Sequence, residues 1–238
     1  MGATFVLVHG AWHGGWCWRD VAALLRGRGH AVTTPTLTGL GERAHLLSAA
    51  IDLDTHITDI VSHMACEDLR DVVLVGHSYG GNVALGVADR AADRIARLIL
   101  LDAGFPESGE TSMDALDART RSGRVRRARE SSGGLSMPVP PAEDFGITDP
   151  VQRAWVQAHL SPHPLRTYLT PLVLSAPRGN GLPACYIACT DPAYRAMQPL
   201  LARVRQAGWP IHALATGHDA MVMAPEATAD LLEAITLR

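Results

Sequence analysis

The 238-residue sequence contains no lysine: all 21 of its basic residues are arginine. Without a lysine amino group the protein cannot form an internal Schiff base, anchor pyridoxal phosphate or complete a Walker A loop. The formal net charge is only −3, and the sequence concentrates no basic face of the kind that nucleic-acid-binding proteins use. Nucleic acid is therefore not an expected partner.

Long apolar runs are also missing, so no transmembrane helix and no membrane partner are expected. The chain enters strand-like sequence at 3–8 without a basic region or a cleavage site before it, so no signal peptide is expected. Its four cysteines, Cys17, Cys66, Cys185 and Cys189, have neither C-x-x-C nor zinc-site spacing. They predict buried, reduced thiols in a cytoplasmic protein that holds no metal.

Strand-like and helix-like segments alternate along the chain, which predicts an α/β fold with a mostly parallel sheet covered on both faces. A chain of this length, 47% hydrophobic, suits one such domain. The expected strands lie at 3–8, 30–35, 72–75, 97–102, 183–190 and 211–215, and the expected helices at 18–28, 54–67, 82–88, 192–206 and 225–236.

Residues 105–177 interrupt this alternation with the glycine pair 133–134, a proline-rich run and polar helical patches. We expect residues 1–104 and 178–238 to form the core, and residues 105–177 to form a cap inserted over the functional site, where such folds vary their selectivity. The arginine-rich run 119–129 within the cap is typical of a solvated helix face. The alternative is that it attracts an anionic substrate.

The pentapeptide Gly76-His77-Ser78-Tyr79-Gly80 directly follows the apolar run 72–75 and precedes a helix-compatible segment. A G-x-S-x-G sequence between a strand and a helix is typical of a nucleophile elbow. The serine at such a turn has strained backbone angles, and glycines on either side avoid collisions that a Cβ would cause. Ser78 is therefore the predicted nucleophile, at the N-terminus of a helix whose dipole favours developing negative charge.

A serine nucleophile needs a general base and an oxyanion hole. His218 is the only one of eleven histidines that follows the last expected strand, which is where folds with this elbow carry their base. The predicted oxyanion donors are two backbone N–H groups. One belongs to Tyr79, the residue after the nucleophile, and the other to Ala11 in the glycine-containing loop 9–16.

Three pieces of the sequence, Val8–Trp16, Gly76–Gly81 and Gly217–Met221, resemble the plant methylesterase and hydroxynitrile lyase family and its bacterial esterase relatives. The resemblance covers most of the chain and is weakest in the cap. It implies an α/β-hydrolase fold, no cofactor, and a serine triad that acts on small esters. It also implies the roles given above: Ser78 as the nucleophile, His218 as the base, and the N–H groups of Ala11 and Tyr79 as the oxyanion donors.

The sequence departs from the lyase branch of that family at two positions. The lyases carry a lysine directly after the catalytic histidine and a threonine in the first oxyanion loop. Asp219 and Gly10 stand at these positions here. Because the chain has no lysine, cyanohydrin cleavage by the lyase mechanism is not expected, and esterase activity is favoured.

The acid of the triad stays open between Asp102 and Asp191. The family's aspartate corresponds in position to Pro192, one residue after Asp191, and Asp191 would also suit the N-cap of a helix that starts with this proline. Asp102 ends the strand after the elbow helix, from which some lipases of the wider fold draw their acid. Either carboxylate would hold the His218 imidazole in the required tautomer.

The favoured interpretation is a serine hydrolase that cleaves a small or medium carboxylic ester, with methyl esters among the candidates, through an acyl-enzyme. Trp12, Phe105, Trp155 and Met221, together with Tyr79, are expected to line an apolar pocket for this small-molecule partner. A homodimer is left open. The alternatives are a lactonase, a thioesterase or a non-hydrolytic biosynthetic enzyme on the same triad, or a ligand-binding receptor on a hydrolase scaffold.

Overall fold

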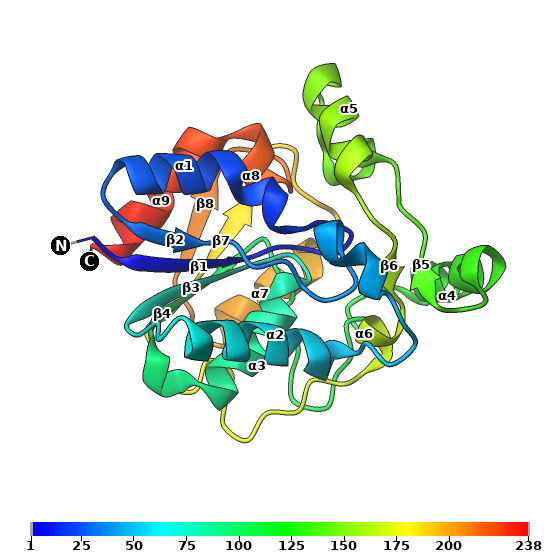
Figure 1. Cartoon of the computed structure of the whole chain (residues 1–238), viewed down its shortest axis with the longest axis horizontal. Helices are drawn as coiled ribbons and strands as arrows, with labels where there is room; N and C mark the ends of the chain where they lie inside the picture. The colour runs from blue at the N-terminus through cyan, green and yellow to red at the C-terminus, as the bar shows by residue number, and fades with distance from the viewer. Residues whose placement is uncertain (1, 238) are drawn as a thin grey trace.

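The computed structural model describes residues 2–237 and is built around a six-stranded sheet with the strand order β2-β1-β3-β4-β7-β8 (Figure 1). All neighbouring strands in this sheet run parallel. Parallel sheets are buried on both faces, which explains the nearly continuous apolar sequence of the central strands. The strands are β1 (Thr4–Val8), β2 (Ala31–Thr33), β3 (Val72–His77), β4 (Ile95–Leu101), β7 (Ala184–Cys189) and β8 (Ile211–Leu214).

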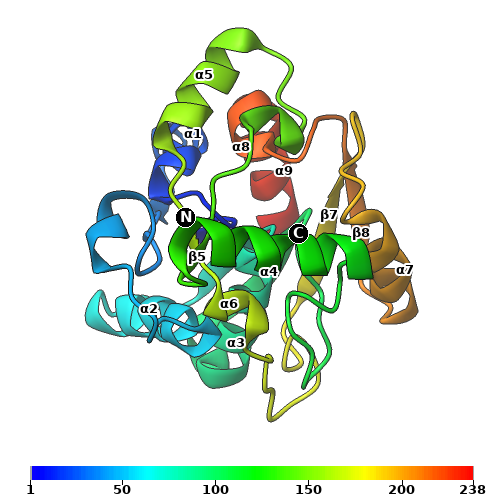
Figure 2. The ribbon, with the colours of Figure 1, turned by 90° about the vertical axis from the view of Figure 1, so that its right-hand side faces the viewer.

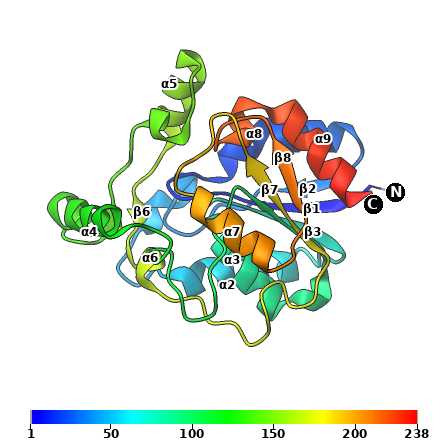
Figure 3. The same cartoon turned by 180° about the vertical axis from the view of Figure 1, so that it is seen from behind.

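Helices cover both faces of the sheet, as the views from the front and from behind show (Figures 1 and 3). On one face lie α1 (Arg19–Gly27), α8 (Ala220–Met223) and α9 (Pro225–Thr236), and on the other lie α2 (Leu53–Cys66), α3 (Gly80–Arg90) and α7 (Gln198–Gln206). Short 3₁₀ helices occupy Gly15–Trp18 (η1), Gly41–Leu46 (η2), Ala92–Arg94 (η3) and Ala142–Phe145 (η4). Within residues 2–237, no helix combines the length and the apolar character needed to cross a membrane.

Helix α2 illustrates how local sequence fixes an element. The Asp52 carboxylate accepts the Thr55 N–H, and the Thr55 hydroxyl accepts the Asp52 N–H, so the two residues form a capping box. Ile57 and Ile60 then fall on one buried face. A Cβ on Gly86 of α3 would lie only 2.3 Å from Ile57 Cδ1, so glycine allows the two helices to pack closely.

The direction of winding reverses between β1 and β3, because the chain passes from β1 to β2 on one side and then to β3 on the other. In open α/β sheets, ligands bind outside the carboxyl ends of the strands at such a reversal. The register pairs Val8 at the end of β1 with Gly76 in β3. The loop after β1 and the turn after β3 therefore leave the sheet side by side.

Between β4 and β7 the chain forms a separate group of elements beyond the carboxyl end of β1 (Figures 1 and 2). Helix α4 crosses in front of the sheet in Figure 2, and α5 rises beside it. The group contains α4 (Ala118–Ser132), α5 (Pro150–His159), α6 (Arg166–Leu169) and the antiparallel pair β5 (Ser136–Met137) and β6 (His163–Pro164). These elements fall within 105–177, where the cap was expected.

The expected strands are all present, and their ends differ from the predictions by at most two residues. One helix prediction is wrong at its start, because α7 begins at Gln198 and not at Pro192. Pro199, which occupies the first turn where a missing N–H costs nothing, marks the real beginning. Asp191 is therefore no helix N-cap, and residues 191–197 form an irregular segment that reaches the site described next.

Candidate active site

Ser78 lies at the sharp turn from β3 into α3, with a φ of +54°. Its N–H donates to the Leu101 carbonyl at 3.2 Å, which ties the turn to the neighbouring strand. A Cβ on Gly76 would lie 2.5 Å from the Gly80 carbonyl oxygen, and one on Gly80 would lie 2.6 Å from the His9 carbonyl oxygen. Only glycine fits at both positions, so the strained serine is held by its close-packed surroundings.

Ser78, His218 and Asp102 form one chain of hydrogen bonds. His218 Nδ1 lies 2.6 Å from Asp102 Oδ2, and His218 Nε2 lies 2.9 Å from Ser78 Oγ. Because a carboxylate only accepts, Nδ1 carries the proton and Nε2 is free to accept the serine hydroxyl. A hydroxyl, an imidazole and a carboxylate in this order can activate the hydroxyl as a nucleophile.

Asp102 follows β4 directly and is 1% exposed. Its N–H donates to the Ile187 carbonyl at 2.7 Å, and its second carboxylate oxygen accepts the Cys189 N–H at 3.3 Å. Asp191 lies elsewhere: it is exposed, and its side chain makes no hydrogen bond within the described chain. Of the two candidate acids, the structure brings only Asp102 to His218.

The His218 ring is packed between two aromatic rings. Tyr194 stacks on it with ring centroids 4.1 Å apart, and His77 lies 4.7 Å away on a tilted plane. His77 Nε2 lies 2.9 Å from the His218 carbonyl oxygen, so this nitrogen must be the donor. The packing fixes both the ring and the backbone of the histidine that faces Ser78.

Two backbone N–H groups are free beside Ser78. The amides of Ala11 and Tyr79 make no hydrogen bond within residues 2–237, and both residues line the same cavity as Ser78. The loop after β1 approaches the nucleophile closely, since a Cβ on Gly10 would lie 2.9 Å from Ser78 Cβ. Unpaired amides that line the cavity of a nucleophile can stabilise an oxyanion.

The segment between β4 and β7 holds the loop after β1 through both backbone groups of Trp12, whose φ is +65°. The Trp12 N–H donates to His163 Nδ1 at 3.2 Å, and the Ser161 N–H donates to the Trp12 carbonyl at 2.9 Å. His163 Nε2 in turn lies 2.8 Å from the Thr167 hydroxyl. Residues about 150 positions away in sequence therefore fix the conformation next to Ala11.

Four buried histidines around the site act as neutral hydrogen-bonding groups. Burial lowers the pKa of His9 to about 3 and that of His56 to about 4, and it lowers the pKa of His77 and of His163 well below the ordinary value. His56 Nε2 faces the Thr38 carbonyl at 2.9 Å, so its Nδ1 accepts the hydroxyl of Tyr79, also at 2.9 Å.

The cavity at Ser78 has a free volume of about 50 Å³. Trp12, Tyr79 and Phe105 line it as expected, but Trp155 and Met221 do not line it within the described chain. Trp155 instead packs beside Trp16 and under the Arg19 guanidinium, whereas Met221 is fully buried in α8. The lining also includes Tyr168, Met197 and Leu200, with Asn82, Glu110 and Ser112 as polar members.

Residues 2–237 hold no cluster of three or more histidine, cysteine or acidic side chains placed to bind a metal ion. All four cysteines are unpaired, and only Cys66 is exposed.

Sequence reasoning missed several residues that shape the site. Tyr194 contacts His218, and both His163 and Ser161 contact Trp12, across long sequence separations. Nothing in the local sequence around these three residues predicts the contacts. His13 and Asp219 pair at 3.0 Å behind the site. These two residues lie inside the motifs after the first and last strands, so their position in the sequence could have indicated that they lie near the site.

An alpha/beta hydrolase family model matches residues 5–231. The carbendazim hydrolyzing esterase of Nocardioides sp. strain SG-4G is 43% identical in an alignment of 244 positions that covers 98% of this chain and 99% of that protein. Methylesterase 2 of Arabidopsis thaliana is 36% identical in an alignment of 118 positions that covers 44% of this chain and 40% of that protein.

A comparison with solved structures also finds an alpha/beta hydrolase. An extracellular alpha/beta-hydrolase from a Paenibacillus species superposes with a TM-score of 0.82 at 25% identity, covering 98% of both chains. That protein is described as sharing structural and functional homology with tobacco salicylic acid binding protein 2.

Proposed function

The chain belongs to the alpha/beta hydrolase family and is a carboxylic ester hydrolase, and we propose that Ser78 is its nucleophile. Membership confirms the fold and the family resemblance expected from the sequence. The observation that carries the proposal is the hydrogen-bond chain from Ser78 Oγ through His218 to Asp102, with links of 2.9 and 2.6 Å.

In the proposed mechanism, Ser78 Oγ attacks the ester carbonyl while His218 Nε2 takes the hydroxyl proton. Asp102 holds the imidazole in its tautomer and stabilises the imidazolium that forms. His218 then returns the proton to the departing alkoxide, so an alcohol leaves and an acyl-enzyme remains. A water molecule, deprotonated by the same nitrogen, hydrolyses the acyl-enzyme to release the carboxylic acid and regenerate Ser78.

The N–H groups of Ala11 and Tyr79 form the oxyanion hole in this proposal. Their lack of intramolecular partners within residues 2–237 supports the role, because the developing oxyanion would be their first acceptor other than water. One such donor is typically worth about 3 kcal/mol of transition-state stabilisation. The hydrogen bonds from the cap to Trp12 keep the first of these amides in position.

The proposed substrate is a small or medium ester, with methyl esters as the first candidates. The aromatic and aliphatic lining formed by Trp12, Phe105 and Leu200 suits an apolar portion of the molecule. The limited free volume of about 50 Å³ at the nucleophile suits a small group beside the reacting carbonyl. Residues 105–177 act as the cap that sets this selectivity.

Hydrolysis of a p-nitrophenyl ester series from acetate to octanoate by the wild type and by Ser78→Ala tests the proposal. Labelling with a fluorophosphonate, followed by mass spectrometry, identifies the modified residue. We expect turnover in the wild type only, with the label on Ser78. Turnover that survives Ser78→Ala, or a label on another serine, would overturn the assignment of the nucleophile.

We further propose that the protein works in the cytoplasm. Its four unpaired cysteines, three of them buried, support this, because free thiols persist in a reducing compartment. Fractionation of the source cells tests the location. The homodimer that the sequence left open stays a hypothesis, which sedimentation of the purified protein would test.

A further inference from the structure

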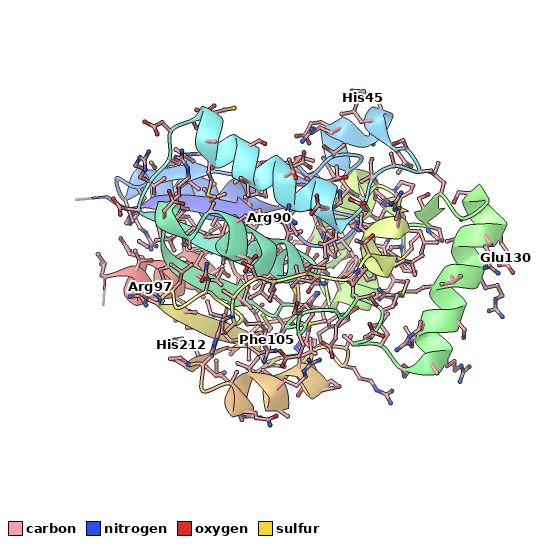
Figure 4. The ribbon with its side chains drawn as sticks, turned by 90° about the horizontal axis from the view of Figure 1, so that it is seen from below. His45, Arg90, Arg97, Phe105, Glu130 and His212 are labelled. Atoms are coloured by element: carbon pink, nitrogen blue, oxygen red, sulfur yellow. The ribbon has the colours of Figure 1, made fainter. Side chains whose placement is uncertain are left out.

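The arginine-rich helix α4 presents most of its charge to solvent. Figure 4 shows this helix at the edge of the molecule, with Glu130 labelled and nitrogen-tipped side chains projecting outward. Arg121 and Arg126 face carboxylates on the surface, at 3.6 Å from Asp114 and 3.8 Å from Glu130. These contacts agree with the solvated helix face expected from the sequence.

Arg124 differs from its neighbours on the helix. It is the one arginine of the run 119–129 that lines the cavity containing Ser78 and His218. Its guanidinium carbon lies 5.3 Å from the ring centroids of both Trp12 and Tyr168. Within residues 2–237 no carboxylate lies within 4.0 Å of it, whereas Arg203, which lines the same cavity, is paired with Glu110 at 2.7 Å.

The Arg124 guanidinium lies over the Trp12 and Tyr168 rings, and its charge opposes the rise that burial causes in the pKa of the Tyr168 hydroxyl. An arginine held beside aromatic rings carries five N–H bonds in one plane, and two of them match the two oxygens of a carboxylate. The aromatic contacts also restrict the side chain, so less freedom is lost when a ligand binds. Arg124 is thus a charged, positioned donor without an anionic partner in the described chain.

A second cavity, of about 460 Å³, meets the catalytic one at this arginine. The two share Trp12, Arg124, Phe145 and Tyr194. The second cavity lies between α4 and the proline-rich segment 138–141, and it also includes Arg127 and one carboxylate, that of the exposed Asp144. A substrate too large for the space at Ser78 would extend past Arg124 into this larger cavity.

We propose that Arg124 forms a subsite for an anionic group of the substrate, so that the enzyme favours esters that carry a carboxylate remote from the scissile bond. The proposal rests on the proposed esterase function, because it defines the substrate class of the same site. The ester group lies at Ser78, and the carboxylate accepts a bidentate pair of N–H bonds from Arg124 where the two cavities meet. Arg127 adds positive potential on the same side.

The kinetic test compares matched esters with and without a carboxylate. p-Nitrophenyl hydrogen glutarate against p-nitrophenyl pentanoate places the charge on the acyl side. para-Acetoxybenzoate against para-acetoxybenzamide places it on the leaving-group side. We expect the wild type to favour the charged ester in at least one pair by about tenfold in kcat/KM. That preference should disappear in Arg124→Gln and persist in Arg126→Gln, which removes an exposed charge from the same helix.

A preference for the neutral ester in both pairs, or a preference that Arg124→Gln leaves intact, would overturn the proposal. A binding measurement separates this failure from a failure of the esterase assignment. In the Ser78→Ala background, para-hydroxybenzoate and glutarate should protect the protein against thermal unfolding more than para-hydroxybenzamide and glutaramide. Arg124→Gln should remove the difference. Equal protection by acid and amide contradicts the subsite whether or not any ester is hydrolysed.

Discussion

His13 and Asp219 form a buried ion pair that joins the loop after β1 to the loop carrying His218. His13 Nε2 lies 3.0 Å from Asp219 Oδ2, and His13 Nδ1 lies 2.8 Å from the Ala11 carbonyl oxygen. Both ring nitrogens face groups that only accept, so both must carry a proton when Asp219 is ionised. The charged ring thereby connects the backbone of a proposed oxyanion donor to the residue next to the proposed base.

The pair makes stability depend on pH. Burial opposes the charged ring, but the Asp219 carboxylate raises the pKa of His13 above 6.5. Burial likewise opposes the carboxylate, yet His13 lowers the pKa of Asp219 below 3.8. The contribution of the charged His13 ring to the free energy of unfolding is complete below pH 6.5 and disappears as pH rises through the pKa that His13 has in the folded protein. The aspartate contribution is complete above pH 3.8 and disappears as pH falls through its folded pKa.

Asp219→Asn should therefore cost the most stability between pH 3.8 and 6.5. We expect a loss of about 3–5 kcal/mol in the free energy of unfolding within this window, because removing the carboxylate leaves the buried charge of His13 without its partner. The loss should shrink in alkaline solution. Urea titrations across the pH range measure it, with Glu226→Gln, an exposed carboxylate at the start of α9, as the control. A pH-independent loss would contradict the charged pair.

The two candidate acids should respond very differently to the same substitution. Asp102→Asn keeps the shape of the side chain at position 102 but leaves His218 in the wrong tautomer. We expect turnover to fall by about 10⁴-fold. Asp191→Asn changes an exposed side chain with no hydrogen bond in the described chain, so turnover should stay within about twofold. Steady-state kinetics on a p-nitrophenyl ester give both values, and a large loss in Asp191→Asn would refute the assignment of Asp102.

The local sequence predicted two site residues at strand ends, Ser78 and His218, which lie within hydrogen-bond distance of each other in the structure. The motif around Ser78 and the position of His218 after the last strand both follow from how parallel strands deliver their carboxyl ends to one edge. The same logic applied to Asp102, but a second aspartate before a proline competed with it. Choosing between them required the distance to His218, which no local pattern contains.

The remaining contacts depend on packing between segments far apart in the chain. Tyr194 was assigned to a helix, yet it belongs to the irregular segment before α7 and stacks on His218. Trp155 was assigned to the pocket because it is a large aromatic in the cap, but it covers Trp16 on the outside. Aromatic character predicts burial against something apolar, and it does not specify which surface the ring will meet.

The acceptor that His163 offers to the Trp12 N–H should matter for both stability and turnover. His163→Leu leaves that amide unpaired in a buried position, at a cost of about 1–3 kcal/mol. Because Trp12 follows Ala11 directly, a shift of the loop would also misplace the first oxyanion donor, and kcat should fall by between tenfold and about a hundredfold. His159→Leu, at an exposed histidine of α5, is the control. Equal effects of both variants on kcat would contradict this role.

Gly80, the first residue of α3, offers a test of the close packing that holds the elbow. A Cβ at position 80 would lie 2.6 Å from the His9 carbonyl oxygen and 2.8 Å from that of Val8. Both obstacles are backbone, so neither can rotate away, and we expect Gly80→Ala to destabilise the fold by at least about 1–3 kcal/mol. Gly27→Ala, with nothing within 4 Å of the new Cβ, should instead stabilise it by about 0.4–1 kcal/mol through the unfolded chain. Thermal unfolding of both variants decides the matter. Opposite shifts are expected, and an unchanged midpoint in Gly80→Ala would mean that β1 and α3 can separate at the nucleophile without cost.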